Sequence, residues 1–169
     1  MATILKPSYS SWSAMTCAFG ALASDANLLA GRASTVVDNS STKYQDVEVA
    51  GKVTTHASVA PTANKQIRLY VYTGLDVTPR YPDGITGSDA GKTLTNAFIR
   101  ENALALAKTL QVSNATGVAY DFRFSLVAVL GFLPTHWGIF IVQDTGQNLD
   151  AAGSQDLRYR GLNTEVVTS

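Results

Sequence analysis

Two stretches of this sequence alternate strictly between apolar and polar residues, and this alternation most constrains the fold. In residues 46–56, valines occupy one parity, whereas charged and hydroxyl residues occupy the other. In residues 67–73, aliphatic residues alternate with Arg68, Tyr70 and Tyr72. A period of two is typical of a half-buried β-strand. Residues 58–64 have the composition of a loop, so the two strands are predicted to form an antiparallel hairpin with a longer connection.

Further strands are predicted downstream of this pair and near the N-terminus. Residues 120–130 begin with alternation and then become apolar on both parities, which predicts a strand whose later part is buried on both faces. Residues 137–142 are wholly apolar, as is typical of a strand at the centre of a sheet or between two layers. Residues 12–19 and 157–161 complete the predicted set of strands.

Three segments do not read as simple strands. Residues 20–41 are poor in large apolar residues, and residues 74–92 contain repeated Pro and Gly, so both are predicted loops. A connection as long as the second is usually functional. Residues 96–112 combine good helix formers with strand parity, which leaves helix and strand open; the all-β context favours a strand.

The sequence therefore predicts an all-β fold, an antiparallel β-sandwich with a jelly-roll-like arrangement. We expect a single domain over residues 1–169, with a long loop at 74–92, an N-terminal arm at 1–11 and a C-terminal tail at 162–169. Ser and Thr together make up 32 of the 169 residues, which suits strands and turns. Cys17 is the only cysteine, so no intrachain disulfide can form.

Charge and hydropathy exclude several classes of partner. Lys plus Arg and Asp plus Glu each number 13, so the chain lacks the basic surface expected of a nucleic-acid binder. No run approaches the ~18 apolar residues of a membrane span, and the N-terminus does not resemble a secretory signal. A neutral, charge-poor surface offers little protection against self-association, which favours a place in an assembly.

Residues 87–93 resemble a phosphate-binding loop, but the spacing between the two glycines is one residue short. His56 and His136 are predicted to be surface histidines, and Cys17 a small core residue. Asp46 and Glu48 share one face of a strand, as glycosidase carboxylates could, but a solvated strand face is the favoured interpretation.

The acidic residues of loop 74–92 are Asp76, Asp83 and Asp89, and their spacing matches no calcium loop. We therefore expect no enzymatic activity, no catalytic residue, no metal ligand, no cofactor and no small-molecule substrate.

Aromatic and arginine side chains are the best candidates for contact with partners, because interfaces are enriched in them. Trp12, near the start of the chain, could anchor on a neighbouring chain. Tyr70 and Tyr72 are predicted to point away from the core with Arg68, either into an interface, onto a sugar or under a second layer. The full set of candidates is Trp12, Arg68, Tyr70, Tyr72, Tyr81, Arg158 and Arg160.

Four short blocks resemble motifs of a family of small structural proteins of tailed bacteriophages. Residues 30–41 (AGRASTVVDNSS) resemble AGRES-x-x-VDN-[ST]-[ST], and residues 81–90 (YPDGITGSDA) resemble YP-[ED]-G-[VI]-T-G-[ST]-DA. Residues 133–139 (LPTHWGI) resemble LP-x-x-WGI, and residues 145–151 (TGQNLDA) resemble TG-x-x-LDA. The blocks stand in this order, and none of them is catalytic.

This resemblance implies a virion component made in many copies, similar to the jelly-roll cement or decoration proteins of capsids. Such a protein would be made in the host cytoplasm and would lie on the outer capsid surface. Its partners would be the major capsid protein and further copies of itself, as a dimer or trimer. The alternative is a carbohydrate-binding or adaptor module of a phage tail, neck or baseplate, with Tyr70, Tyr72 and Tyr81 stacking on sugars.

Overall fold

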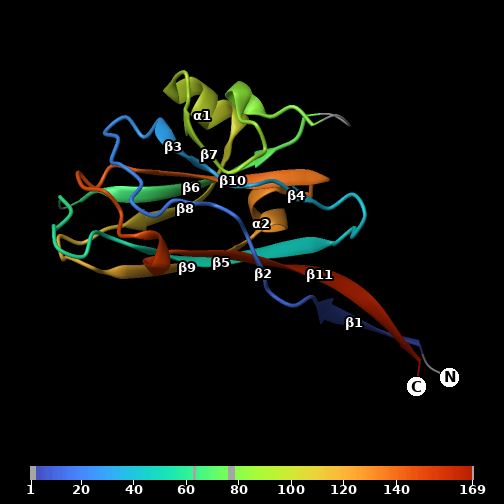
Figure 1. The fold of residues 1–169 in the computed structure, drawn as a ribbon. Coiled ribbons are helices and arrows are strands. Elements are labelled where there is room, and N and C mark those ends of the chain that lie inside the picture. The colour runs from blue at the N-terminus through green and yellow to red at the C-terminus, as the bar shows by residue number, and fades with distance from the viewer. Residues whose placement is uncertain (1–2, 63, 76–78, 169) are drawn as a thin grey trace.

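Two antiparallel β-sheets lie face to face in the computed structural model, which describes residues 3–62, 64–75 and 79–168 (Figure 1). Sheet A has the order β1 (Thr3–Tyr9), β11 (Asp156–Thr168), β5 (Asp46–Thr54) and β9 (Ala119–Ser125), and β2 (Ser13–Ala14) pairs with β11. Sheet B has the order β7 (Ala90–Thr93), β3 (Ala30–Ala33), β10 (His136–Gln143), β6 (Gln66–Thr73) and β8 (Ala105–Gln111), and β4 (Val37–Asp38) pairs with β10. The short helices are α1 (Ala97–Ala103), α2 (Leu126–Leu130) and the 3-10 turns η1 (Pro82–Gly84) and η2 (Ala152–Ser154). The predicted all-β sandwich of antiparallel sheets is confirmed, and the jelly-roll arrangement stays a prediction.

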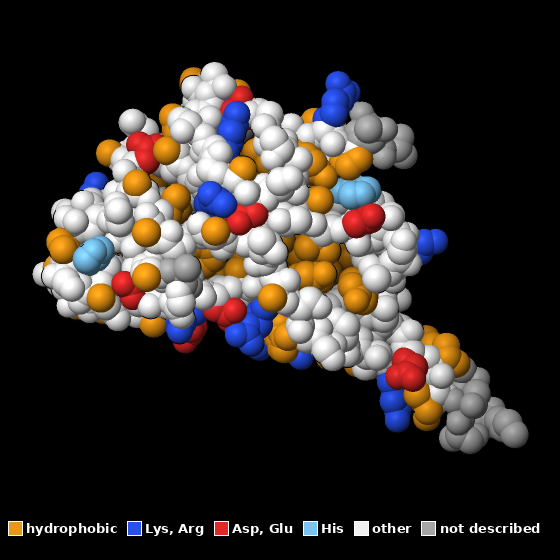
Figure 2. All heavy atoms as spheres, viewed as in Figure 1, with side chains coloured by type: hydrophobic (Ala, Val, Ile, Leu, Met, Phe, Trp, Pro, Cys, Tyr) orange, Lys and Arg blue, Asp and Glu red, His pale blue; other side chains and the backbone are white. Residues whose placement is uncertain are grey.

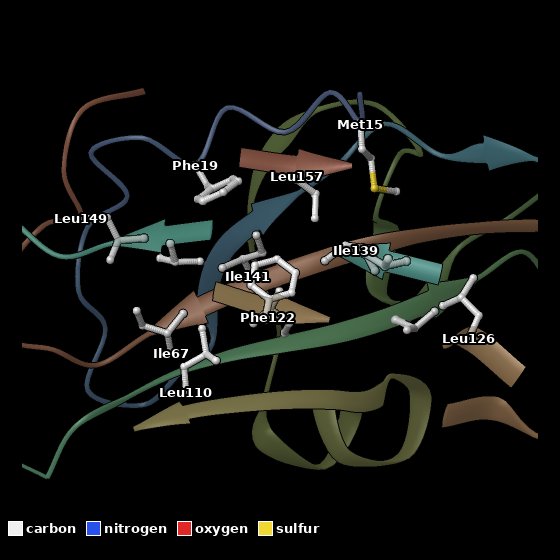
Figure 3. Packing of buried hydrophobic residues seen from close by; sticks show 14 of the residues in the cluster. Met15, Phe19, Ile67, Leu110, Phe122, Leu126, Ile139, Ile141, Leu149 and Leu157 are labelled. Atoms are coloured by element: carbon white, nitrogen blue, oxygen red, sulfur yellow. The ribbon is translucent and has the colours of Figure 1, made fainter. Parts of the chain in front are cut away.

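The main core lies between the two sheets, as the alternation predicts (Figure 3). Val47, Val49 and Val53 of β5 are fully buried on the inner face of sheet A. Apolar side chains of sheet B face these valines. On β6 they are the residues that alternate with Tyr70 and Tyr72. The buried members on β6 and β10 are Ile67, Leu69, Val71, Trp137, Ile139 and Ile141. Apolar burial of this kind stabilises the fold by about 25 cal/mol per Å².

Sheet B carries a second core on its outer face, so it is buried on both sides. Tyr72 of β6 and Phe140 of β10 are fully buried there beneath a cover that includes Ile85 and Leu94. In Figure 1 this cover lies above β6 and β10 of sheet B and contains α1. The wholly apolar segment 137–142 is therefore a central strand between two layers, as predicted.

Two aspartates of the predicted loop 74–92 fasten the cover through hydrogen bonds. Asp89 accepts a 2.6 Å hydrogen bond from Arg32 Nε, which lowers the pKa of the carboxyl below its ordinary value. Asp83 accepts hydrogen bonds of 2.7 Å from the hydroxyl and the amide of Thr95, and the hydroxyl contact is the larger cause of its lowered pKa. Asp89 thus ties the segment before β7 to β3, and Asp83 ties η1 to the segment that follows β7. Asp76 lies outside the described residues.

The predicted hairpin between β5 and β6 is wrong. β5 pairs with β11 and β9 in sheet A, whereas β6 pairs with β10 and β8 in sheet B. The segment between them crosses from one layer to the other. Alternation specifies which side of a strand is buried, and both strands bury their apolar sides in the same core, so the pattern fits opposite sheets as well as one hairpin.

The predicted strand 120–130 is correct only as far as Ser125. The next five residues form α2, whose first turn is capped by the Ser125 side chain, which accepts a 3.0 Å hydrogen bond from the Ala128 amide. Gly131 ends the helix with φ 79°. The predicted strand 12–19 is also largely wrong, because only β2 within it pairs with a neighbour.

Three ambiguous or loop-like segments contain more structure than predicted. Segment 96–112 is not one strand: Asn96 caps α1 by accepting a 2.9 Å hydrogen bond from the Ile99 amide, and β8 follows the helix. The predicted loop 20–41 contains β3 and β4, whose small and polar residues give little apolar signal. The predicted loop 74–92 is interrupted by η1 and by the start of β7.

The first and last strands form a two-stranded ribbon that projects from the body (Figures 1 and 2). β1 pairs with the second half of β11, from Thr3 opposite Thr168 to Tyr9 opposite Leu162. The segments expected to be an N-terminal arm and a C-terminal tail are thus held to each other by a β-ladder.

Gly138 gives a direct test of the second core. A Cβ at this position would lie 2.2 Å from Tyr72 Cζ, so Gly138→Ala must displace a buried tyrosine ring. We expect a loss of about 3 kcal/mol in the free energy of unfolding, measured by urea denaturation. The matched control is Gly91→Ala, because a Cβ at Gly91 meets nothing within 4 Å. An equal loss in both variants would contradict the packing described for Tyr72.

Candidate interaction face

The outer face of sheet A, on the side away from the core, carries a connected set of ion pairs. We use this name for the side chains on the outward parity of its three long strands. They are Asp46, Glu48, Ala50 and Lys52 of β5, Asp121, Arg123 and Ser125 of β9, and Asp156, Arg158 and Arg160 of β11. In Figure 2, acidic and basic side chains gather along the underside of the body, where this sheet lies. Among the described residues, no further layer of strands or helices covers this face (Figure 1).

Trp12 lies on this face and is held there by arginine side chains. The guanidinium carbon of Arg160 is 4.7 Å from the centre of the Trp12 ring, and that of Arg123 is 5.8 Å away. Arg160 also lies 4.5 Å from the centre of the Tyr9 ring. Contacts between guanidinium groups and aromatic rings contribute ~0.5–1 kcal/mol each at exposed sites. Two aromatic rings and two arginines therefore form one connected group.

Glu48 forms ion pairs with both of these arginines. Its Oε2 accepts a 2.6 Å hydrogen bond from Arg160 Nε, and its Oε1 lies 3.0 Å from Arg123 Nε. The carboxylate thus bridges β11 and β9 across β5, and it keeps two like charges close together beneath Trp12. The neighbouring Asp46 has a different task, because it accepts a 3.0 Å hydrogen bond from the Val127 amide at the start of α2.

Two hollows open on the same face. The larger has a volume of about 960 Å³, and its walls include Trp12, Lys52, Asp121 and Arg158. The smaller, of about 320 Å³, is more apolar, and its walls are Tyr9, Asp46, Glu48, Arg123, Phe124, Ser125 and Leu162. A partner in contact with both would meet aromatic rings in a surface of paired charges, which is the composition of many protein interfaces.

The structure brings together three of the predicted interface residues and separates the others. Trp12, Arg158 and Arg160 share the outer face of sheet A, and Arg158 donates a 2.7 Å hydrogen bond from Nε to Asp156. The other four predicted residues lie on the side of sheet B that faces away from sheet A. They are Arg68, Tyr70, Tyr72 and Tyr81.

Tyr70 and Tyr72 do not form a partner surface, which corrects that expectation. They are only 2% and 0% exposed, because the cover lies over them, as the alternative of a second layer predicted. The Tyr72 hydroxyl donates a 2.6 Å hydrogen bond to the Ser34 carbonyl, and burial raises the pKa of Tyr72. Stacking of these two rings on a sugar is therefore wrong.

Arg68 and Tyr81 lie at the margins of the same second core. Arg68 is half-buried and donates a 3.3 Å hydrogen bond from Nη1 to the Tyr70 hydroxyl. Tyr81 is also half-buried, and its ring lies edge-on to Tyr72 with centroids 5.5 Å apart. The cover thus occupies both residues at least in part.

The loop that resembles a phosphate-binding motif does not adopt that structure. Residues 90–93 form β7, whereas the phosphate-binding motif requires a helix at this point. Lys92 Nζ instead lies 3.9 Å from an Asp83 oxygen. The ring Nδ1 of His56 accepts hydrogen bonds of 3.1 Å from the amides of Ser58 and Val59, so it caps a turn.

The other groups singled out for chemistry have structural surroundings too. His136 Nε2 lies 3.5 Å from an Asp38 oxygen at the β10–β4 pairing. Burial and the nearby Asp89 carboxylate raise the pKa of the Cys17 thiol to about 12, so this thiol is protonated at neutral pH. Within the part of the chain that the structure describes, no three His, Cys, Asp or Glu side chains group closely enough to hold a metal ion.

Sequence reasoning did not name Tyr9, Glu48 or Leu162 as interface candidates, nor Phe124, which lies on the inward parity of β9 and lines the smaller hollow. Glu48 gave a usable signal, because it lies on the polar parity of β5. Leu162 also gave one, because it continues the parity of Arg158 and Arg160 beyond the predicted end of the strand. The pairing of the two chain ends, which places Tyr9 beside Leu162, has no local signal.

No family model matches this sequence, and no curated protein matches it. No helix among the described residues is long and apolar enough to cross a membrane.

Arg160 and Arg158 provide a matched test of the site. Arg160→Met removes the cation beside Trp12 and Tyr9 and leaves Glu48 with one partner, so we expect a loss of about 1–2 kcal/mol in the free energy of unfolding. Acrylamide quenching of tryptophan fluorescence should also increase, because Trp12 loses its stacked neighbour and Trp137 is fully buried. Arg158→Met breaks only an exposed pair and should cost less than ~0.5 kcal/mol. Equal effects of the two substitutions would contradict this description.

Proposed function

We propose that this chain is a non-enzymatic virion structural protein of a tailed bacteriophage, a decoration or cement protein that binds and stabilises the major capsid protein shell. The observation that carries the proposal is the uncovered outer face of sheet A, where Trp12 is fixed between arginines and flanked by two hollows. The protein would be made in the host cytoplasm and would lie on the outer surface of the capsid.

The placement of the four phage-like blocks supports the outer face of sheet A as the surface for a partner. Three of them meet around sheet B: the Val36 amide donates a 2.9 Å hydrogen bond to the Gly87 carbonyl, and the Asn39 amide donates a 2.7 Å hydrogen bond to the Thr135 carbonyl. The fourth block, residues 145–151, follows β10 directly. The resembling residues thus build sheet B and its cover, which leaves the outer face of sheet A for a partner.

The charge pattern of the face also suits attachment to a shell. Glu48 and Asp156 already pair with arginines within the chain. Attachment would then depend mainly on apolar and aromatic contact, which salt screens little. Repetition over many copies would add these modest contacts into resistance of the shell to heat and internal pressure.

Shell binding can be measured with the capsids of the phage that encodes this chain. We expect the purified protein to co-sediment with shells stripped of it and to raise their melting temperature, and Trp12→Ala should weaken binding at least tenfold. The control is Phe98→Ala, because Phe98 is 78% exposed but lies on α1, over sheet B. Shells whose thermal and osmotic stability is the same with and without the protein would contradict the proposal.

A carbohydrate-binding or adaptor module of a tail, neck or baseplate is the second candidate. The hollow of about 960 Å³ beside Trp12 favours it, because aromatic rings next to polar side chains are a usual surface for sugars. A glycan array should then give a signal that Trp12→Ala abolishes and Phe98→Ala retains. Absence of any glycan signal, together with shell binding, would exclude this candidate.

A further inference from the structure

The ribbon of β1 and β11 has one apolar face and one polar face. The ladder places Leu5, Pro7 and Tyr9 of β1 on the same side as Val166, Thr164 and Leu162 of β11. We call these six residues the apolar ribbon face. The opposite side carries Ile4 and Val167 at the tip, followed by Lys6, Glu165, Ser8 and Asn163. The apolar ribbon face contains no charged residue.

The apolar ribbon face is largely exposed in the isolated chain. Leu5 is 66% exposed, Val166 61% and Tyr9 54%. Figure 2 shows that this ribbon extends beyond the body, and the order of sheet A gives it two strands only. A two-stranded ribbon is marginally stable in water unless a hydrophobic face packs against something. The exposed face therefore needs a covering surface.

The edge of β1 argues against covering by a further strand. The Ser10 amide donates a 2.9 Å hydrogen bond to the Gly161 carbonyl, so residues an even number of positions from Ser10 turn their amides toward β11. Pro7 is three positions away, and its nitrogen faces the open edge, where it offers no hydrogen-bond donor. Proline at an open edge blocks the addition of a strand. Addition of a strand on the β1 side is thus disfavoured, whereas the apolar ribbon face is open to contact.

The same side of sheet A supplies a surface that fits the tip of this ribbon. The hollow of about 320 Å³ at the base of the ribbon is partly walled by Tyr9, Leu162 and Phe124. Leu5 and Val166 project at the tip, four residues farther along each strand, which is about 14 Å at strand spacing. Consider a second copy that is rotated by 180° about an axis that crosses the middle of the ribbon in the plane of contact. The apolar ribbon faces of the two copies then meet, and the tip of each ribbon lies over the hollow at the base of the other.

We propose that two copies of this chain pair through their apolar ribbon faces across such a two-fold axis, with Leu5 and Val166 of each copy seated at the hollow of the other. The two ribbons then stack as a small four-stranded sandwich, ~10 Å apart. A face without charge offers an acidic or basic partner nothing to complement, whereas it matches its own copy.

The area available agrees with this pairing. Leu5, Tyr9 and Val166 together expose on the order of 350 Å² in one copy, or ~700 Å² in two, from typical side-chain areas. Pro7, Leu162, Thr164 and the walls of the hollow supply the remainder of the ~1,200 Å² at which specific interfaces begin. The contact is therefore small but sufficient for a dimer.

Sedimentation equilibrium of the purified protein tests the pairing. We expect a mass of twice 17.9 kDa for the wild type. Leu5→Asp combined with Val166→Asp places two carboxylates in the contact and should raise the dissociation constant at least a hundredfold. The control is Ile4→Asp, since Ile4 is 45% exposed at the same tip but on the opposite face, and this variant should stay dimeric. A monomeric wild type, a mass above the dimer, or equal effects of the two variants would overturn the proposal.

Cross-linking provides a second test that does not depend on weakening the contact. With Cys17 replaced by Ser, Thr164→Cys lies near the two-fold axis and should give dimers with a short bis-maleimide. Asn163→Cys, the adjacent residue on the opposite ribbon face, should not. Equal yields from both cysteines would overturn the proposal. Because both tests use the protein alone, their outcome is separate from that of shell binding; a monomer that binds shells through Leu5 and Val166 would show that the capsid, and not a second copy, covers this face.

Discussion

The burial of sheet B on both faces is the constraint on which the rest of this structure depends. Its central strand β10 is apolar on both parities, so one face must meet sheet A and the other must be covered by something else. The chain supplies that cover with α1 and with the loops before and after β7, and Tyr72 closes over Gly138 beneath it. Residues that read as irregular loop in sequence are therefore committed to a hydrophobic layer.

This commitment determines which surface is left for partners. Because Tyr70 and Tyr72 are enclosed, the outward side of sheet B is not a contact surface of aromatic rings. Sheet A has no equivalent cover among the described residues, and its outward parity is charged except where Trp12 and Tyr9 lie on Arg160. On the outer face of sheet A, the aromatic residues available to a partner are consequently Tyr9 and Trp12, near the first strand of the chain.

Local periodicity was sufficient to predict β5, β6 and β10 and the sides that they bury, but it did not predict β1, β3, β4 or β7. It could not predict pairing between distant segments, because β5 and β6 show the same alternation whether they share a sheet or face each other. The site divides in the same way: Arg158 and Arg160 follow from strand parity and Trp12 from its residue type. The Glu48 bridge and the position of Tyr9 depend on contacts across more than a hundred residues of chain, which no local pattern encodes.

The two surfaces proposed for contact differ in the physics that would govern them. Around Trp12, Glu48 pairs with both Arg160 and Arg123, so a partner gains aromatic contact at a site where each cation already has a carboxylate neighbour. Along the ribbon, an uncharged face is exposed, and Pro7 disfavours the addition of a strand to the open edge of β1. Contact through the apolar ribbon face across a two-fold axis closes after two copies. Such a pair turns its two outer faces of sheet A in opposite directions, so one copy meets a given shell surface while the outer face of the other copy points away from it.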